Sequence, residues 1–261
     1  MPIARRGPEP DVLRFAVTGS TNADALRQAR KGRAADAWFV AEEQNGGRGR
    51  HGRHWTSARG GLYATRLLVL DLPLQNLVGL TLVAGIAVYD TAASHLAGKS
   101  EPGLMLKWPN DLLANGAKLA GILIETESLG ARGTAIAIGV GLNVANPLSG
   151  DAAKATSLSL LGGTKDVGAV FSTLGHALAE QLMVWDASRG FAAVAAAWER
   201  RAMAVGTPTQ VRLPNGAIKG TYAGLDSTGG LRLRLASGAI RAIHAGEITL
   251  APVERRTRSQ P

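Results

Sequence analysis

The chain has 261 residues, of which 46% are hydrophobic, with a formal net charge of +9 and no cysteine. This length allows one or two domains with a sizeable core, and the lack of cysteine excludes disulfide bonds and thiolate metal sites. The positive charge fits nucleic acid, a membrane surface or an anionic substrate, but without a helix-turn-helix pattern or an aromatic-spaced basic stripe we expect no DNA binding.

The N-terminus carries no recognisable targeting signal. Its two arginines, Arg5 and Arg6, are not followed by the apolar run of a secretory signal. The longest apolar run, Leu77 to Tyr89, is too short to span a bilayer and contains two glycines, so it predicts a buried helix. Together with the absence of cysteine, these features predict a cytoplasmic protein with no membrane partner.

The N-terminal part of the chain alternates predicted strands and helices. Val12–Val17 is a short predicted strand. Thr21 can cap a helix that runs to about Arg30, with Asp24 completing a T-x-x-D capping box. Two further strands and a long helix with apolar residues on more than one face follow in this order: Trp38–Glu43, Leu62–Leu70 and Leu74–Leu96.

The middle of the chain predicts consecutive antiparallel strands rather than βαβ units, because Asn115-Gly116 is a strong two-residue hairpin turn. The predicted strands are Leu104–Trp108, Lys118–Glu127 and Ala135–Val140. Two helices are predicted after them, Val167–Trp185 and the Ala-rich stretch Phe191–Met203.

From Gly206 the pattern changes to short β segments separated by turn signals, which predicts a small barrel. These segments lie near Gln210–Leu213, Lys219–Leu225, Gly230–Leu235 and Ala239–Ile243. We therefore place a domain boundary near residue 205, with domains at 12–205 and 206–252. The predicted fold class is α+β, a mixed or antiparallel sheet with helices followed by a small β-barrel.

The stretch Glu42–Trp55, EEQNGGRGRHGRHW, interleaves four glycines with three arginines. Glycine lets main-chain N–H groups approach a ligand closely, and arginine presents a planar fork that matches carboxylate and phosphate oxygens. A loop built from both can wrap an anion that carries more than one negative group. The stretch is neither a dinucleotide GxGxxG nor a Walker A loop. Without further evidence it also fits a flexible basic loop that binds nucleic acid weakly.

Five separated motifs resemble the signature set of biotin protein ligases and occur in that family's order. They are GSTN at Gly19–Asn22, GRGRHGR at Gly47–Arg53, KWPND at Lys107–Asp111, KLAGIL at Lys118–Leu123 and GVGLNV at Gly139–Val144. The resemblance implies a class II synthetase-like catalytic domain followed by an SH3-like module, in the form without an N-terminal DNA-binding domain.

The resemblance also implies the reaction and the partners. ATP and Mg²⁺ would convert biotin to biotinyl-5'-AMP, and biotin would then pass to a lysine of the biotin carboxyl carrier protein of acetyl-CoA carboxylase or a related carboxylase. A homodimer is compatible with the family.

The first step sets an electrostatic problem, because a carboxylate must attack the α-phosphorus of ATP while further negative charge develops. Fixed positive charge offsets this negative charge, so we expect catalytic roles for Lys118, Arg50, Arg48 and Lys107. We expect biotin contacts, several of them implied by the resemblance, from Ser20, Thr21, Asn22, Gln44, Gly47, Arg48, Gly49, Arg50, Lys118 and Gly121. We expect nucleotide contacts from Arg53, Trp55, Asn110, Asp111 and Asn143, and no protein metal ligands.

Simpler roles remain open for several of these residues. Thr21 can be a helix cap alone, and Asn143 can mark a left-handed turn after a strand. Trp55 can stack on adenine or anchor the end of the loop. For the whole chain, the alternatives are an acyl-adenylate enzyme like lipoate ligase and a non-enzymatic nucleic-acid-binding module.

Overall fold

The computed structural model describes residues 10–32, 36–72, 77, 79–96, 98, 103–146, 155–213 and 216–250. The chain divides into two compact units, Met1–Ala202 and Met203–Pro261. The functional division into domains at 12–205 and 206–252 stays a prediction.

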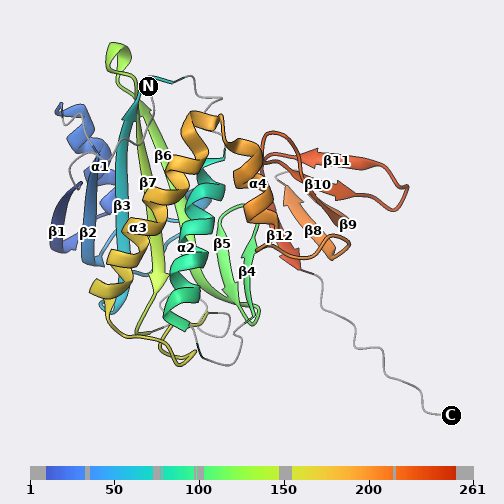
Figure 1. The fold of residues 1–261 in the computed structure, drawn as a ribbon, viewed down its shortest axis with the longest axis horizontal. Helices are drawn as coiled ribbons and strands as arrows, with labels where there is room; N and C mark the ends of the chain where they lie inside the picture. Colours follow the sequence, from blue (N-terminus) through green and yellow to red (C-terminus); the bar gives the residue numbers. More distant parts are fainter. Residues whose placement is uncertain are drawn as a thin grey trace. The chain divides into compact units, whose positions relative to one another are not determined.

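The first unit is built on one seven-stranded mixed sheet with strand order β1-β2-β3-β7-β6-β5-β4 (Figure 1). Its strands are β1 Asp11–Thr18, β2 Ala37–Gln44, β3 Gly61–Leu70, β4 Leu104–Lys107, β5 Asp111–Ala114, β6 Ala117–Ser128 and β7 Thr134–Asn143. Only the β1–β2 pair is parallel, and β4 to β7 pair in antiparallel succession, which confirms the prediction for the middle of the chain.

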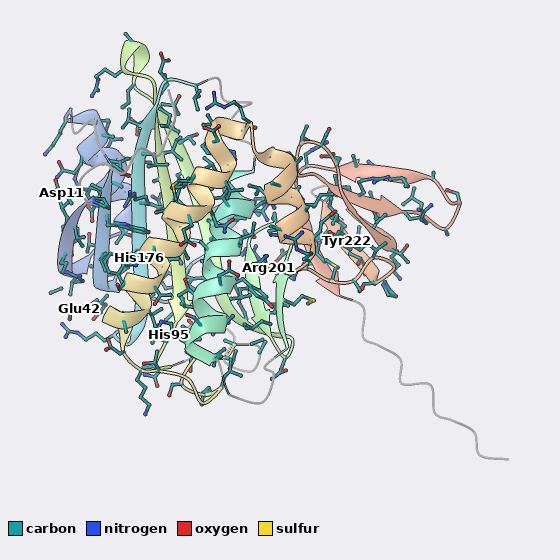
Figure 2. All side chains as sticks on the ribbon, in the orientation of Figure 1. Asp11, Glu42, His95, His176, Arg201 and Tyr222 are labelled. Atoms are coloured by element: carbon teal, nitrogen blue, oxygen red, sulfur yellow. The ribbon has the colours of Figure 1, made fainter. Side chains whose placement is uncertain are left out.

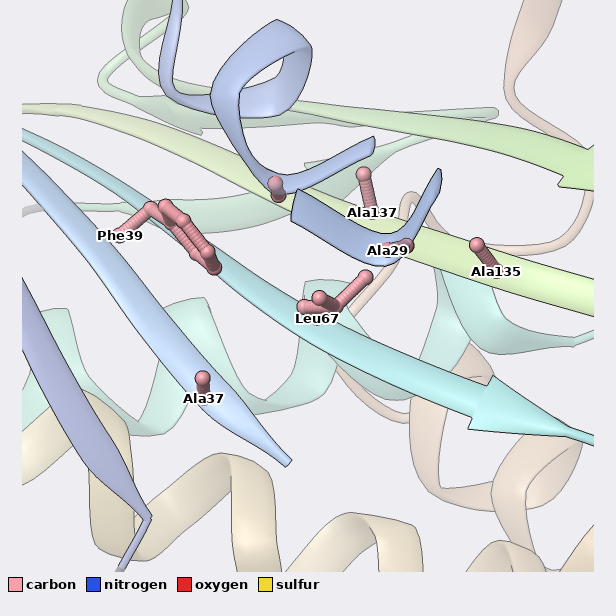
Figure 3. Packing of buried hydrophobic residues seen from close by; sticks show 7 residues of the cluster. Ala29, Ala37, Phe39, Leu67, Ala135 and Ala137 are labelled. Carbon is pink, nitrogen blue, oxygen red and sulfur yellow. The ribbon is translucent and has the colours of Figure 1, made fainter. Parts of the chain in front are cut away.

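Helices cover both faces of this sheet. The helices of the unit are α1 Thr21–Arg30, α2 Leu80–Leu96, α3 Val167–Trp185 and α4 Phe191–Glu199. Helix α1 packs on β2, β3 and β7 through small residues, and Figure 3 shows it on the side opposite α2 and α3. Ala25 and Ala29 meet Phe39, Leu67 and neighbouring alanines, so the helix lies close to the strands.

The other face carries the more apolar helices α2 and α3, which pack against each other. Trp38 on β2 meets the ring of Phe171 on α3 edge to face, with ring centroids 5.4 Å apart. The segment Val167–Ser188 is long and apolar enough to cross a membrane by composition alone. In this fold Val170, Leu174, Leu178 and Leu182, which recur every four residues along one side of the helix, are buried, as expected of a helix that packs one side on a protein core.

Four local predictions were wrong in detail. Helix α2 begins at Leu80, not Leu74, because Gly79 has φ +90°, outside the helical region; residues 73–76 and 78 lie outside the described residues. Helix α4 ends at Glu199, and just beyond its end the Arg201 carbonyl accepts a hydrogen bond from Leu106 N on the edge strand β4. Ser20, not Thr21, caps α1. Strand β5, between two turns, was not predicted.

The second unit is a five-stranded antiparallel sheet with order β11-β10-β9-β8-β12. Its strands are β8 Pro208–Leu213, β9 Gly216–Leu225, β10 Leu231–Arg234, β11 Ile240–Ile243 and β12 Glu247–Leu250. Its core contains Val211 of β8, Tyr222 of β9 and Leu233 of β10, all buried. Figure 2 labels Tyr222. The sheet fits the small SH3-like module expected here, with β12 as the strand that the sequence pattern missed.

Candidate active site

Three of the five motifs meet in one row across the face of the sheet that carries α1. The strand register places Lys107 opposite Asp111, Asp111 opposite Gly121, Gly121 opposite Gly141, and Gly141 opposite Tyr63. Directly opposed residues point to the same face of a sheet. The KWPND, KLAGIL and GVGLNV motifs, far apart in the sequence, therefore form one surface.

A β-bulge brings Lys118 onto this surface. The β5–β6 register shifts by one residue between Leu112 and Leu113, so that Lys118 lies opposite Leu113 and faces the same side as Asp111. In an unbroken ladder the alternation of side chains would send Lys118 to the other face. Bulges commonly re-aim a side chain in this way next to a functional site.

Asp111 joins the two motif lysines. Its Oδ1 lies 2.6 Å from Lys118 Nζ and its Oδ2 lies 3.1 Å from Lys107 Nζ. The Asp111 side chain is only 11% exposed, so the three groups form a fixed cluster with one surplus positive charge. Such a cluster suits an incoming anion, because its charges are held in place before the ligand arrives.

Gly121 and Gly141 form a floor without side chains, and Trp55 lies on it. A Cβ atom at Gly141 would come within 2.7 Å of the indole, and one at Gly121 within 3.1 Å. Lys118 Nζ is 5.1 Å from the centre of the same ring, a cation–π distance. Trp55 thus anchors the end of the glycine/arginine loop on the sheet, one of the two roles left open by the sequence; contact with adenine stays a prediction.

The glycine/arginine loop is folded as a narrow hairpin. Arg48 and His54 form an isolated antiparallel bridge, and Trp55 N donates to the Gly47 carbonyl at 3.0 Å. Any side chain at position 47 would collide with the Trp55 carbonyl oxygen, whereas a Cβ at Gly49 would meet nothing closer than 3.6 Å. Gly47 is therefore required by packing, and Gly49 is not.

The arginines of the hairpin have different surroundings. Arg50, in the single-turn helix Arg50–Gly52, is half-buried, and its Nη1 lies 3.4 Å from Asn110 Oδ1. Asn110 is itself held by a 2.9 Å bond from its Nδ2 to the Ile122 carbonyl. Arg53 is exposed and donates to the Arg50 carbonyl at 3.4 Å. The hairpin thus turns Arg50 toward the KWPND motif and Arg53 toward solvent.

Gln44 connects the start of α1 to the segment after the hairpin. Its Oε1 accepts from Thr21 N at 2.9 Å and from Thr21 Oγ1 at 3.1 Å, and its Nε2 donates to Ser57 Oγ at 2.9 Å. The predicted partners Ser20 and Thr21 are both buried beside it. Both ends of the Gln44 amide are thus engaged by protein groups in this structure.

Asn22 is the most tightly held of the GSTN side chains. Its Oδ1 accepts from Thr65 Oγ1 at 2.7 Å, while its Nδ2 donates to the Leu123 carbonyl at 3.1 Å and to Glu125 Oε2 at 2.8 Å. Its carboxamide also fills the space where Gly139 has no side chain. Asn22 therefore fixes the start of α1 against the sheet.

The predicted residue Asn143 lies at the edge of this arrangement, as does Tyr63, which was not predicted. Asn143 is buried, and its Nδ2 donates to the carbonyls of Thr156 at 2.8 Å and Lys118 at 3.4 Å. It thus holds the backbone that carries Lys118. Tyr63 donates to the Ala58 carbonyl at 2.7 Å. Burial, and then the charge of Glu43, raise the pKa of Tyr63, so its hydroxyl stays protonated.

The sequence analysis missed four residues of this site: Thr65, Ser57, Glu125 and, at its edge, Tyr63. Thr65 and Glu125 have a signal that becomes visible once the strands are aligned. Thr65 is a polar residue in the mostly apolar strand β3, which also contains Arg66, and Glu125 lies two alternations beyond Gly121 on the same face. The motif boundaries stopped short of both.

No group of three or more His, Cys, Asp or Glu side chains that could hold a metal ion occurs among the described residues. His95 on α2 contacts Thr173 Oγ1 at 3.0 Å, and His176 on α3 contacts the Ser172 carbonyl at 2.9 Å. Figure 2 shows both histidines on their helices.

Two family models match the chain. The model described as the biotin/lipoate A/B protein ligase family matches residues 15–143, and the one described as the biotin protein ligase C-terminal domain matches residues 205–250. The first range contains all the motifs of the site except the end of GVGLNV.

Individual proteins match over nearly the whole chain. A biotin–acetyl-CoA-carboxylase ligase of Paracoccus denitrificans is 36% identical over 246 residues, covering 90% of this chain and 98% of the relative. The bifunctional ligase/repressor BirA of Escherichia coli is 30% identical over 243 residues, covering 92% and 74%. The structure of an Aquifex aeolicus biotin protein ligase in complex with biotin and ATP has a TM-score of 0.73 and 26% identity, covering 92% of this chain and 98% of that one.

Proposed function

This chain belongs to the biotin protein ligase family, and we propose from this premise that it activates biotin on the sheet face described above. The observation that carries this assignment is the gathering of Lys107, Asp111 and Lys118 beside the glycine floor and under the arginine hairpin. The face combines fixed positive charge with a glycine floor that carries the Trp55 ring. Fixed charge beside a positioned ligand is what adenylation of a carboxylate requires.

In the first half-reaction a biotin carboxylate oxygen attacks the α-phosphorus of ATP, forming biotinyl-5'-AMP and releasing pyrophosphate. The nucleophile is already ionised, so no general base is needed. Lys118 and Lys107 offset the charge that develops on the phosphorus oxygens, and Asp111 keeps the two ammonium groups in place. Arg48 and Arg50 approach from the hairpin and shield the mixed anhydride from water.

The predicted binding residues divide along the same face. Biotin lies along the start of α1 and the end of β2, where Ser20, Thr21, Asn22 and Gln44 gather, beside Gly121, over which the Trp55 ring lies in this structure. Because both ends of the Gln44 amide are engaged, its contact with the ureido ring requires exchange of one of these bonds. The nucleotide is contacted by Arg53, Trp55, Asn110, Asp111 and Asn143.

Magnesium fits this site as an ion carried by ATP. Mg²⁺ keeps several waters and usually binds through substrate phosphates and one or two carboxylates. Asp111 and Glu125 both hold cationic partners here, so the donor set does not favour a cage made only of protein. Bound with ATP, the ion supplies positive charge to the phosphates.

In the second half-reaction a lysine amine of the acceptor attacks the mixed anhydride and AMP leaves. We propose that the acceptor is the carrier domain of acetyl-CoA carboxylase or a related carboxylase. The net charge of +9 would speed encounter with an acidic carrier. The second unit, whose described residues include no arginine-glycine hairpin like Gly47–Trp55, serves carrier recognition or nucleotide retention in this proposal.

Biotin-dependent exchange between ATP and pyrophosphate tests the proposed function. We expect exchange with biotin and none with lipoate, followed by AMP release when a carrier domain is added. Exchange with lipoate alone would favour the lipoate-ligase alternative. No exchange with either acid, together with salt-sensitive RNA or DNA binding unaffected by biotin, would favour the nucleic-acid-binding alternative.

A further inference from the structure

Glu125 on β6 connects two parts of the site that are far apart in the sequence. Its Oε2 accepts the 2.8 Å hydrogen bond from Asn22 Nδ2, and its Oε1 lies 3.5 Å from Arg48 Nη2. Glu125 belongs to none of the five motifs. It stands on the site face because it follows Gly121 by two alternations along the strand.

The Asn22 end of this connection is rigid. The Asn22 side chain is almost completely buried, and its carboxamide is bound by Thr65, the Leu123 carbonyl and Glu125 together. The Glu125 carboxylate is thus held in one orientation by a fixed amide. An arginine that meets a fixed carboxylate loses less entropy on binding than one that must order both partners.

The Arg48 end is adjustable. Arg48 is about half exposed, at 49%, and the ion pair engages one of its terminal nitrogens. A guanidinium has five N–H donors in a planar fork, so the remaining donors can face an incoming anion without breaking the contact with Glu125. The geometry therefore suits a carboxylate that positions the arginine rather than one that competes with the ligand.

We propose that Glu125 is a positioning residue, which ties Arg48 of the hairpin to Asn22 at the start of α1 and so holds the loop over the binding face before substrate arrives. This role rests on the proposed function, because the substrate anion is the group that Arg48 then meets. It couples the biotin end of the site to the loop that covers the intermediate.

The test compares Glu125→Gln with Glu127→Gln. Glutamine at 125 can still accept from Asn22 but loses the charge that holds Arg48. Glu127 lies two residues after Glu125 on the same face of β6. Its partner at 2.7 Å is Arg30 on α1, away from the hairpin. We expect Glu125→Gln to raise the KM for biotin about two- to fivefold, the range that a partly exposed ion pair supports, with a smaller change in kcat. Glu127→Gln should change neither.

A second measurement needs no catalysis. Limited trypsin digestion of the ligand-free protein should cleave faster after Arg48 in Glu125→Gln than in Glu127→Gln or wild type, and 0.5 M salt should accelerate cleavage of the wild type toward the variant rate. Equal cleavage in both variants, with equal KM, would overturn the proposal. If wild type shows no biotin-dependent exchange, the proposed function fails while the digestion result still decides whether Glu125 holds the loop.

If circular dichroism shows that Glu125→Gln does not fold, a double-mutant cycle with Arg48→Gln and Glu125→Asp replaces it. If Glu125 acts through Arg48, Glu125→Asp should increase cleavage after residue 50 in the wild-type background and add nothing in the Arg48→Gln background. Additive effects would overturn the proposal.

Discussion

The indole of Trp55 packs on Gly141 and fits there because Gly141 has no side chain: a Cβ at this position would lie 2.7 Å from the indole. Gly141 lies near the C-terminal end of β7, opposite Gly121 and Tyr63. Its backbone conformation is open to any residue, because its φ is not positive. The glycine is therefore needed for the contact with Trp55 and not for the strand.

Gly141→Ala should displace the indole and release the end of the hairpin. Overpacking of this kind typically costs about 1–3 kcal/mol. We expect a lower midpoint in urea unfolding. We also expect biotin-dependent exchange between ATP and pyrophosphate to fall by more than the unfolded fraction of the variant accounts for. Gly175→Ala in α3 is the control, since a Cβ there meets nothing within 4 Å and alanine favours the helix. Unchanged activity in Gly141→Ala would show that the position of Trp55 does not matter to the reaction.

Lys118→Ala should abolish adenylate formation and leave the fold intact. Loss of one fixed donor at a developing oxyanion typically costs about 3 kcal/mol or more. The fold should persist because Asp111 keeps Lys107 as its partner at 3.1 Å. The measurement is single-turnover biotinyl-AMP formation with ATP and biotin saturating, beside circular dichroism. Wild-type turnover in this variant would remove Lys118 from the reacting groups.

The sequence predicted the elements well where local pattern decides them. Helix α3 has the predicted bounds, Val167–Trp185, and the antiparallel succession of strands followed from the Asn115-Gly116 turn. The motifs identified most of the residues that the sheet gathers. Turn chemistry and periodicity are short-range properties, and they can be read without knowing the fold.

The rest of the site depends on long-range pairing. Lys118 faces Asp111 because of a bulge in the β5–β6 ladder, which no local signal announces. Asn22 and Glu125 are 103 positions apart in the chain and meet only through the register of four strands. Ser20, and not the predicted Thr21, caps the helix, because the Thr21 hydroxyl donates to Gln44 Oε1 instead. Each outcome follows from tertiary contacts that compete with a local preference.

A truncation that ends near Val205 should retain some biotinyl-AMP synthesis, because the described contacts of the site lie within residues 20–156 of the first unit. Transfer to a carrier domain, or retention of the nucleotide, should suffer more. The measurement is adenylate formation by the truncated chain after circular dichroism has shown that it is folded. A folded truncation that makes no adenylate would place the second unit in the active site.

Asp226 should make the second unit sensitive to acid. Burial raises the pKa of this carboxyl, but hydrogen bonds from Thr228 and Gly230 and the charge of His244 outweigh burial and hold the pKa below its usual range. A depressed carboxyl pKa stabilises the fold above the unfolded value, about 3.9, and this contribution is lost as pH falls through the folded value.

Asp226→Asn should therefore lower the free energy of unfolding at pH 7 by about 1 kcal/mol, because an amide is a weaker acceptor for these bonds. The difference between variant and wild type should shrink as the pH falls below 4. Urea unfolding at pH 7 and at pH 3 measures both values. A difference that stays constant between the two pH values would mean that the Asp226 charge contributes nothing to stability.

Arg50→Ala should increase leakage of the activated intermediate. Arg50 is half-buried and approaches Asn110 Oδ1 at 3.4 Å, so it spans from the hairpin to the KWPND motif. Removing it opens the cover over the mixed anhydride and lets biotinyl-AMP escape, whereas the lysines that offset charge remain.

The measurement is the ratio of free biotinyl-AMP to pyrophosphate released, together with biotin attached to lysines of an added bystander protein. Arg59→Ala is the matched control, because Arg59 is exposed and pairs with Glu42 at 2.9 Å. We expect a several-fold higher ratio for Arg50→Ala and a wild-type ratio for Arg59→Ala. If Arg50→Ala lost activity without any leakage, the arginine would serve the chemical step, since an opened cover must release the intermediate that the site still makes.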